Sequence, residues 1–255
     1  MGYCSGIIDI SNVICYCRYC YKNLVQTNEK GINMRKTFHE KLNEINEDVL
    51  LMGSLVQEAV HNSIEAILGI NVDLAQKVID KDEKIDEYDI LIEEKCIVLQ
   101  AEHQPVARDL RLLHSISILI KNLERIGDLA VNISKIVKKL AGEKKKQLDK
   151  EIIDLLVEMG NLVEPELNGA LDSFKNKDAK LASKLGKSDG TVDEIQRLIF
   201  KKLFTSHKSK ENIKFVTNVA LASRYLERIG DQAVNIGERV LFFLTGDYKV
   251  FHDDI

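Results

Sequence analysis

The sequence predicts an all-α protein built from two tandem antiparallel three-helix bundles that are related by internal duplication. Apolar residues recur at spacings of three and four from Met34 onward, without the sustained alternation that marks strands. The chain has only two prolines and is 45% hydrophobic and 30% charged, which is typical of helix-rich soluble proteins. The segment LERIGDLAVNI at residues 123–133 returns as LERIGDQAVNI at residues 226–236. Because this spacing exceeds the unit of a solenoid repeat, we expect a duplicated domain.

Three helices are expected in the first half, which extends over residues 34–142. The apolar spacing is interrupted at Asn71 and again before Pro105, a residue that suits the first turn of a helix. Long helices joined by such short turns pack as antiparallel neighbours. The expected helices lie at about residues 35–69, 74–100 and 105–141. The inner face of the first helix is predicted to consist of Leu42, Ile45, Val49, Met52, Val56, Ala59 and Val60.

The second half, residues 147–248, repeats this scheme after a solvated link that contains Gly142 and three lysines. Pro165 falls inside the first helix of this half and should kink the helix or break it locally. The expected helices lie at about residues 148–174, 178–205 and 213–244.

Residues 1–33 are predicted to be a leader outside this fold. Four of the five cysteines fall in it, at Cys4, Cys15, Cys17 and Cys20. The C-Y-C-R-Y-C segment could hold zinc or an iron–sulfur cluster, but its spacing matches no common zinc finger and no second Cys or His group completes it. We therefore expect a poorly ordered leader, with translation starting at either Met1 or Met34.

Composition and motifs exclude several classes of function. The net charge of −4 argues against a nucleic-acid partner. No apolar run approaches the roughly 18 residues that span a bilayer, and the first residues lack the basic region of a signal peptide. The sequence contains no G-x-S-x-G motif, P-loop or paired Cys and His, and Gly127 and Gly230 fall within helices, where they favour close packing. We expect a cytoplasmic protein that is not an enzyme.

Each half carries two acidic pairs at a spacing of four, which places both carboxylates of a pair on one helix face. The two pairs of a half lie at similar distances on either side of a turn, so all four carboxylates are predicted to meet at one level of the bundle. The pairs of the first half are Asp82/Asp86 and Glu124/Asp128, and those of the second half are Asp189/Asp193 and Glu227/Asp231.

Four carboxylates at one level repel one another unless a cation neutralises them. On a single helix, acids at this spacing are usually a solvated surface, but the match across the duplication favours a shared role. One source of positive charge is an ion-pair network with nearby arginines, namely Arg108, Arg111, Arg125, Arg224 and Arg228. The other is a bound metal, and carboxylate oxygens suit Mg²⁺, Mn²⁺, Ca²⁺ or iron.

The two E-R-x-x-D-x-x-x-N blocks, each preceded by a D-x-x-[IV]-D pair, resemble the PhoU family of phosphate-regulatory proteins. The segments MRKTFHEKL from Met34 and PVARDLR at residues 105–111 add to the likeness, which covers about residues 34–248. The resemblance implies a non-catalytic regulator of the phosphate ABC transporter, acting on its ATPase subunit and on a sensor histidine kinase, and often a homodimer. The leader lies outside the usual extent of the family.

The resemblance also implies that the acidic pairs bind metal clusters, with iron or other cations such as Mn or Mg. Transferred by motif, one site would contain Asp82, Asp86, Glu124 and Asp128, and the other Asp189, Asp193, Glu227 and Asp231. Asn132 and Asn235 would be additional oxygen ligands.

Two alternatives remain open at the level of the sequence. A di-iron carboxylate oxidase needs two Glu-x-x-His motifs on different helices, and the chain offers one, Glu58-x-x-His61. A metal-free helical adaptor, whose acidic stripes are structural ion-pair networks, fits the same motifs.

Overall fold

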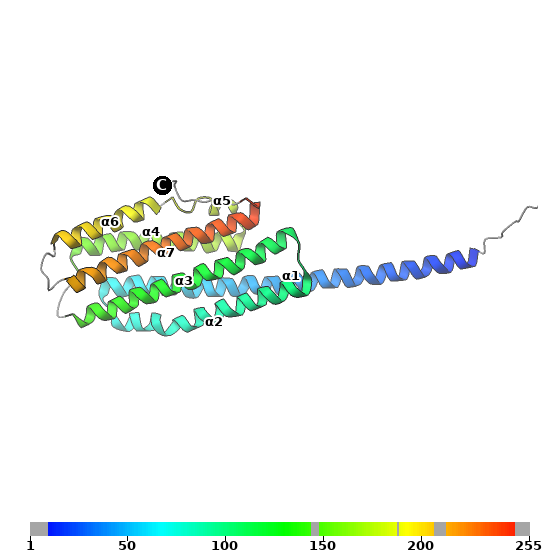
Figure 1. Cartoon of the computed structure of the whole chain (residues 1–255), viewed down its shortest axis with the longest axis horizontal. Coiled ribbons are helices and arrows are strands. Elements are labelled where there is room, and N and C mark those ends of the chain that lie inside the picture. The colour runs from blue at the N-terminus through cyan, green and yellow to red at the C-terminus, as the bar shows by residue number, and fades with distance from the viewer. Residues whose placement is uncertain (1–9, 144–147, 188, 207–212, 248–255) are drawn as a thin grey trace, which may run out of the picture. The chain divides into compact units, whose positions relative to one another are not determined.

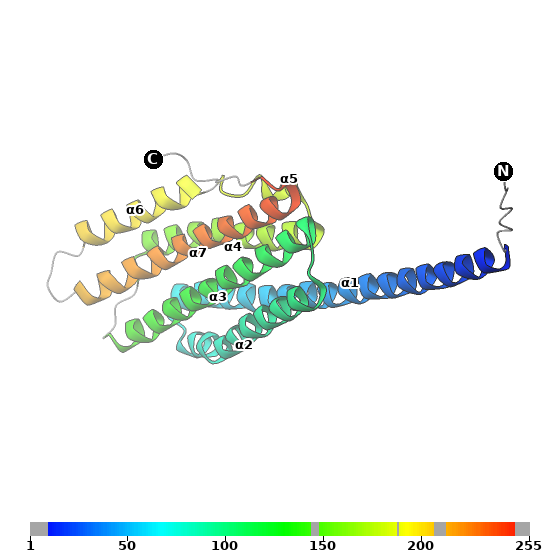
Figure 2. The same cartoon turned by 45° about the vertical axis from the view of Figure 1, so that its right-hand side comes forward.

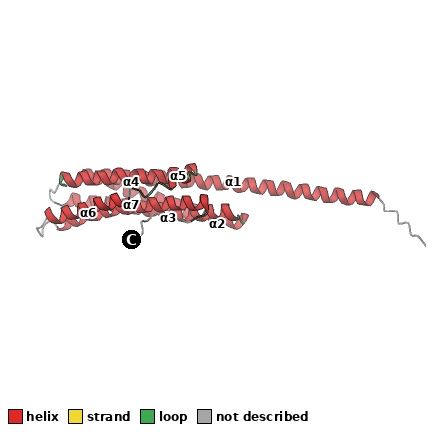
Figure 3. Ribbon diagram, turned by 90° about the horizontal axis from the view of Figure 1, so that it is seen from above, coloured by secondary structure: helices red, strands yellow, loops and turns green. Residues whose placement is uncertain are grey.

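The computed structural model describes residues 10–143, 148–187, 189–206 and 213–247, with side chains from residue 36 onward except those of Asp189 and Ser206. All regular elements in these ranges are helices (Figures 1 and 3). They are α1 (Ile10–Gly69), α2 (Val72–His103), α3 (Ala107–Gly142), α4 (Lys150–Asn176), α5 (Ala179–Ala182), α6 (Asp189–Ser206) and α7 (Ile213–Thr245). Within the described residues, no helix carries an apolar stretch long enough to cross a bilayer.

The chain divides into two compact units, Met1–Glu44 and Ile45–Ile255. The described backbone of the first unit belongs to α1, which begins at Ile10 rather than near the predicted Arg35. The side chains of Cys15, Cys17 and Cys20 lie outside the described residues, as does Cys4, so the proposals for the leader stay predictions. Cys96 is buried in the second unit, and burial raises the pKa of its thiol to about 11.

The second unit contains the end of α1 with α2 and α3 from the first half, and α4 to α7 from the second half. The prediction of an all-α fold is confirmed. Helices α3 and α7 lie side by side and run in opposite directions (Figures 1 and 2). Helix α2 packs on α3, while α4 and α6 pack on α7. The helices that carry the two copies of the repeated segment therefore form the contact between the halves. The predicted inner face of α1 from Ile45 to Val60 is buried.

Helices α1 and α4, the first helix of each half, also contact each other across the duplication. An offset of 107 positions, which aligns Asp82 with Asp189, also aligns Gln57 with Glu164 and His61 with Asn168. The amide of Gln57 donates to Asn168 Oδ1 at 2.5 Å, and Nδ1 of His61 lies 3.1 Å from Oε1 of Glu164. The two contacts exchange equivalent positions, so this pair of helices follows a pseudo-two-fold axis.

Glycines show the same symmetry on either side of these hydrogen bonds. At the offset of 107, Gly53 corresponds to Gly160 and Ile64 to Leu171. A Cβ at Gly53 would lie 2.6 Å from Cδ2 of Leu171, and one at Gly160 would lie 3.2 Å from Cγ2 of Ile64. Each glycine thus makes room for the large side chain of the opposite half.

The predicted helix at residues 178–205 is wrong in one respect, because the structure divides it into α5 and α6. Asp178 caps α5 by accepting hydrogen bonds from the backbone N–H groups of Lys180 and Leu181. Gly186 then adopts a φ of 82°, in the left-handed region that ends helices. Its N–H donates to the carboxylate of Glu166.

Pro165 lies inside α4 without breaking it, since the helix is continuous from Lys150 to Asn176. The turn expected at Asn71 is present, and the side chain of Asn71 caps α2 by accepting from the N–H of Leu74 at 3.1 Å. The ends of α2, α3, α4 and α7 all lie within about three residues of the expected bounds.

Replacing Gly186 by alanine should destabilise the protein by about 1–2 kcal/mol, because an L residue is strained at positive φ. The measurement is the free energy of unfolding in urea. The matched control is Gly190→Ala in the first turn of α6, where a Cβ would meet no described atom within 4 Å and where alanine favours the helix. Equal losses in both variants would contradict this account of the break between α5 and α6.

Candidate functional site

The structure brings the first four predicted carboxylates together where α2 packs on α3. Burial, followed by the charges of Asp86 and Asp128, raises the pKa of Asp82 to about 6. Burial and the charge of Asp128 also raise the pKa of Asp86 and of Glu124. The negative charges of α3 thus raise the pKa values of carboxyl groups on α2, and the reverse also holds. This is expected for acidic pairs that lie at similar distances on either side of a turn.

Gly127 allows α2 to approach α3 at this cluster. A Cβ at Gly127 would lie 3.1 Å from Cδ1 of Ile85 and 3.4 Å from Oδ1 of Asp82. Ile85 is buried between the two acids of its helix. The equivalent Gly230 has more room, because a Cβ there would lie 3.7 Å from the nearest atom, Cγ2 of Val163 in α4.

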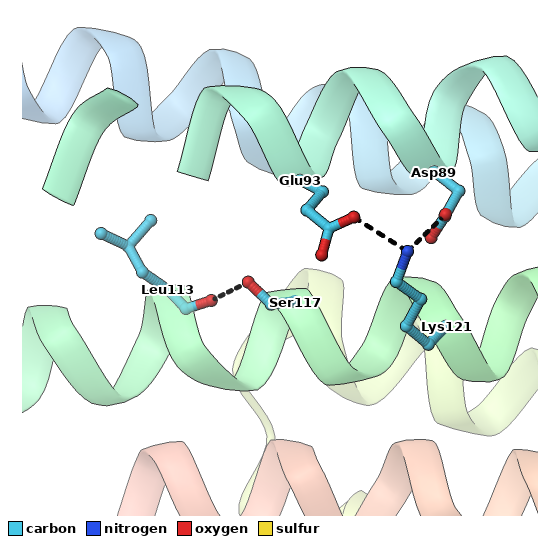
Figure 4. A network of polar contacts seen from close by, with 5 residues as sticks. All are labelled: Asp89, Glu93, Leu113, Ser117 and Lys121. Atoms are coloured by element: carbon cyan, nitrogen blue, oxygen red, sulfur yellow. Dashed lines mark hydrogen bonds and ion pairs between the residues drawn. The ribbon is translucent and has the colours of Figure 1, made fainter. Parts of the chain in front are cut away.

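Asp89 extends the first cluster and was not among the predicted site residues. It is only 7% exposed, and its Oδ2 accepts a hydrogen bond from Nζ of Lys121 at 2.6 Å. The same ammonium donates to Oε2 of Glu93 at 3.0 Å. Figure 4 shows Lys121 reaching from α3 to both carboxylates of α2. The sequence signal was available, since Asp82, Asp86, Asp89 and Glu93 recur at helical spacing.

The other carboxylate oxygen of Asp89, Oδ1, is buried and has no hydrogen-bond partner in the part of the chain that the structure describes. The charge of Asp89 contributes to the raised pKa of both Asp86 and Glu124. Lys121 therefore neutralises the first cluster only in part, because its ammonium group pairs with Asp89 and Glu93 and not with the four predicted carboxylates.

The second cluster centres on Glu227 of α7, which is 5% exposed. Burial, followed by the charge of Asp231, raises the pKa of Glu227 to about 7, and Asp193 of α6 contributes in the same direction. Nη1 of Arg224 donates to Oε1 of Glu227 at 2.5 Å. The second oxygen, Oε2, is buried and accepts no hydrogen bond from an N–H group of the described residues, although Asp193 interacts with the same carboxyl group. The side chain of Asp189 lies outside the described residues.

The remaining predicted residues lie on the same stripes. Asn132 and Asn235 are half-buried, one helical turn beyond Asp128 and Asp231. Arg125 and Arg228, which follow the two glutamates in the sequence, are exposed and form no ion pair with a described residue. Lys121 and Arg224, three residues before each glutamate, contact the clusters instead, and Nη2 of Arg197 lies 3.8 Å from Oδ2 of Asp193 in the second cluster.

The clusters fit a cation by their chemistry, although their side chains are not arranged as a finished metal site. Among the described residues, no three Asp, Glu, His or Cys side chains converge closely enough to hold an ion. However, the donors are hard oxygens that suit Mg²⁺, Mn²⁺ or iron. Oδ1 of Asp89 and Oε2 of Glu227 are buried without a hydrogen-bond donor among the described residues, and together with the raised carboxyl pKa values they indicate an excess of negative charge. An ion that enters either cluster would need side-chain rotation to complete its ligands.

Glu58 and His61, the single Glu-x-x-His motif, contact different neighbours. Nζ of Lys81 lies 2.5 Å from Oε1 of Glu58, whereas His61 contacts Glu164 of α4. The two side chains therefore do not share one site in the way that a di-iron centre requires.

Replacing Glu227 by glutamine should remove a pH dependence of stability. The pKa of Glu227 in the folded state is about 7 instead of 4.5. The folded protein therefore binds more protons than the unfolded chain between these values, and its stability falls as the pH rises through them. In protein freed of metal by a chelator, the variant should gain about 1–2 kcal/mol at pH 8 and much less at pH 5, measured by urea unfolding.

The control for this variant is Glu194→Gln, which removes an exposed carboxylate one position after Asp193 in α6. It should leave the difference between pH 5 and pH 8 unchanged. If the Glu227 variant kept the pH dependence of the parent protein, the burial of an ionised Glu227 would not be a cost to folding.

Comparison with known proteins assigns both halves to one family. The model of the PhoU domain matches the chain twice, over residues 49–137 and 156–240. A phosphate-specific transport system accessory protein PhoU homolog from Clostridium acetobutylicum is 35% identical over 221 residues, which cover 86% of this chain and 99% of that protein.

Solved structures agree with this assignment. The crystal structure of PhoU from Pseudomonas aeruginosa superposes with a TM-score of 0.78 at 34% identity, covering 82% of this chain and all of the other. The phosphate transport system regulatory protein PhoU from Streptococcus pneumoniae gives a TM-score of 0.76 at 30% identity over 84% of this chain and 99% of the other. With both repeats matched and the whole bundle shared, this chain belongs to the PhoU domain family.

Proposed function

We propose that this protein is a non-enzymatic regulator of phosphate uptake and of phosphate-responsive signalling. Relatives that cover most of the chain are named accessory or regulatory proteins of phosphate transport systems. Under this proposal the protein works in the cytoplasm as a homodimer. Its partners are the ATPase subunit of the phosphate ABC transporter and a sensor histidine kinase.

The structural part of the proposal rests on one observation, the two incompletely neutralised carboxylate clusters at equivalent places in the repeats. We infer that both clusters bind metal cations. Asp82, Asp86, Glu124 and Asp128 would hold an ion in the first half, and Asp189, Asp193, Glu227 and Asp231 in the second, with Asn132 and Asn235 as further oxygen donors. A bound cation supplies the positive charge that offsets the repulsion among the carboxylates.

The clusters lie between helices, which gives a cation a structural consequence in each half. Asp82 and Asp86 belong to α2, whereas Glu124 and Asp128 belong to α3. Carboxylates that repel one another across this contact weaken it, and an ion shared between the helices strengthens it. The number of cations bound to the clusters would thereby determine how stably α2 packs on α3 and α6 packs on α7. These outer helices would form part of the surface that partners contact.

A metal-free adaptor is the second candidate, and two observations favour it. Lys121 and Arg224 already give each cluster a cation of the chain itself. Moreover, no three ligand side chains converge within the described residues. In this alternative the clusters are structural ion-pair networks, and the protein regulates its partners through its helical surface alone.

Metal titration separates the two candidates. Chelator-treated protein should bind Mn²⁺, and Glu124→Gln combined with Asp128→Asn should abolish the ion in the first half and the thermal stabilisation that accompanies it. Calorimetry and the melting temperature are the measurements. Glu87→Gln with Glu94→Gln serves as the control, because it removes two exposed carboxylates of α2 outside the cluster. Absence of binding with Mn²⁺, Fe³⁺ and Mg²⁺ alike would favour the adaptor.

The regulatory proposal is tested in the organism that carries this gene. Deletion should raise the uptake of labelled phosphate by cells grown in phosphate-rich medium, because the restraint on the transporter is lost. The parent gene should restore low uptake, and affinity purification of the tagged protein from the same cells should recover the transporter ATPase or the sensor kinase. Unchanged uptake, together with recovery of neither partner, would overturn the assignment.

A further inference from the structure

The two clusters carry their own cations at equivalent positions but use them differently. The offset of 103 positions between the repeated segments aligns Lys121 with Arg224 and Glu124 with Glu227. In the first half, Lys121 contacts Asp89 and Glu93 across the helix pair. In the second half, Arg224 contacts Glu227 on its own helix. Lys121 therefore binds carboxylates next to the repeated motif, whereas Arg224 binds Glu227, a carboxylate of the motif itself.

The residues of the neighbouring helix explain this difference. At the offset of 107 that aligns α6 with α2, Asp89 corresponds to Gln196 and Glu93 to Phe200. The two helices bury the same positions here, namely Ile85, Ile92 and Cys96 in α2 and their counterparts Val192, Ile199 and Leu203 in α6. Because α6 offers no carboxylate at these two places, the guanidinium of Arg224 turns to the glutamate three residues further along its own helix.

The contact with Arg224 occupies an oxygen that a metal would need. Oε1 of Glu227 accepts the hydrogen bond from Arg224, while the buried Oε2 receives no hydrogen bond from a cation among the described residues. No lysine or arginine among the described residues is bonded to Glu124 in the first half, and the ammonium of Lys121 already contacts two other carboxylates. Each half also has a second cation, since the charge of Lys135 acts on Asp82 in the first and Arg197 pairs with Asp193 in the second. The first cluster contains two more carboxylates, Asp89 and Glu93, for the same number of cations, so its field attracts a further cation more strongly.

We propose that the two clusters are unequal cation sites, in which Arg224 is the resident counterion of the second and competes with a divalent metal for Glu227. This inference rests on the proposed metal binding. The first cluster takes up an ion at the lower concentration, and the second does so only when Arg224 leaves Glu227. Half of the Arg224 side chain is exposed, so the guanidinium can move into solvent without being buried elsewhere. Arg224 thus lowers the affinity of the second cluster for metal by occupying Glu227.

The test is a titration of chelator-treated full-length protein with Mn²⁺, followed by calorimetry. The parent protein should show two classes of site with different dissociation constants. Glu124→Gln with Asp128→Asn should remove the tighter class, and Glu227→Gln with Asp231→Asn should remove the weaker one. Arg224→Gln should tighten the weaker class by about tenfold, the order of magnitude of one lost charge-assisted contact, and leave the other class unchanged.

Arg228→Gln is the matched control for Arg224→Gln. It removes the same charge four residues away, from an exposed side chain without an ion pair among the described residues. If this control tightened the weaker class as much as Arg224→Gln did, the effect would be a general loss of positive charge and the proposal would be overturned. Lys121→Gln should strengthen only the tighter class, because it frees Asp89 and Glu93.

Other outcomes separate the inequality of the two sites from metal binding itself. Two classes of equal affinity in the parent protein would overturn the inequality while leaving metal binding intact. The same holds if Arg224→Gln leaves the weaker class as it was. If the parent protein binds no Mn²⁺ at all, metal binding itself fails, and the inference fails with it.

Discussion

The contact between α3 and α7 is the interaction on which the rest of the second unit depends. Both helices are buried round much of their circumference, because each lies against the other and against the outer helices of its own half. The apolar area that they remove from water is the main favourable term for the bundle. Since both helices carry the repeated segment, this packing also fixes where the acidic stripes can lie. The stripes lie along the margin of the apolar core, and their members range from the buried Glu227 to the exposed Asp86 and Asp128.

That marginal position gives the carboxylates their unusual properties. A fully exposed acidic pair is well solvated and costs little, whereas a fully buried one must be neutralised or paired. Asp82 is half-buried and Glu227 is buried, and burial together with neighbouring carboxylates raises the pKa values of both. The bundle therefore holds charge that it neither hydrates fully nor neutralises fully. Such clusters respond to any cation that becomes available, whether from the chain or from solution.

The duplication has preserved the packing more faithfully than the charge. Gly53 and Gly160 still receive large side chains from the opposite half, and the polar contacts between α1 and α4 still exchange equivalent positions. Packing in a core tolerates few changes in volume, so both halves keep the same pattern. Charged residues at the margin are less constrained, and α6 has Gln196 and Phe200 where α2 has Asp89 and Glu93. The structural symmetry is thus approximate, while the electrostatic symmetry is lost.

The sequence by itself determined the helical class, the duplication, most helix ends and the level at which the acidic pairs of the first half meet. These features follow from periodicity, capping residues and the constant rise of a helix, which are local properties. Only the tertiary structure decided which cation forms an ion pair with which carboxylate. Lys121 and Arg224 occupy equivalent positions, and their partners depend on side chains that another helix brings within reach. The break between α5 and α6 and the pairing of α1 with α4 were likewise beyond the sequence. Each depends on contacts between residues far apart in the chain, such as Gly186 with Glu166 and Gln57 with Asn168.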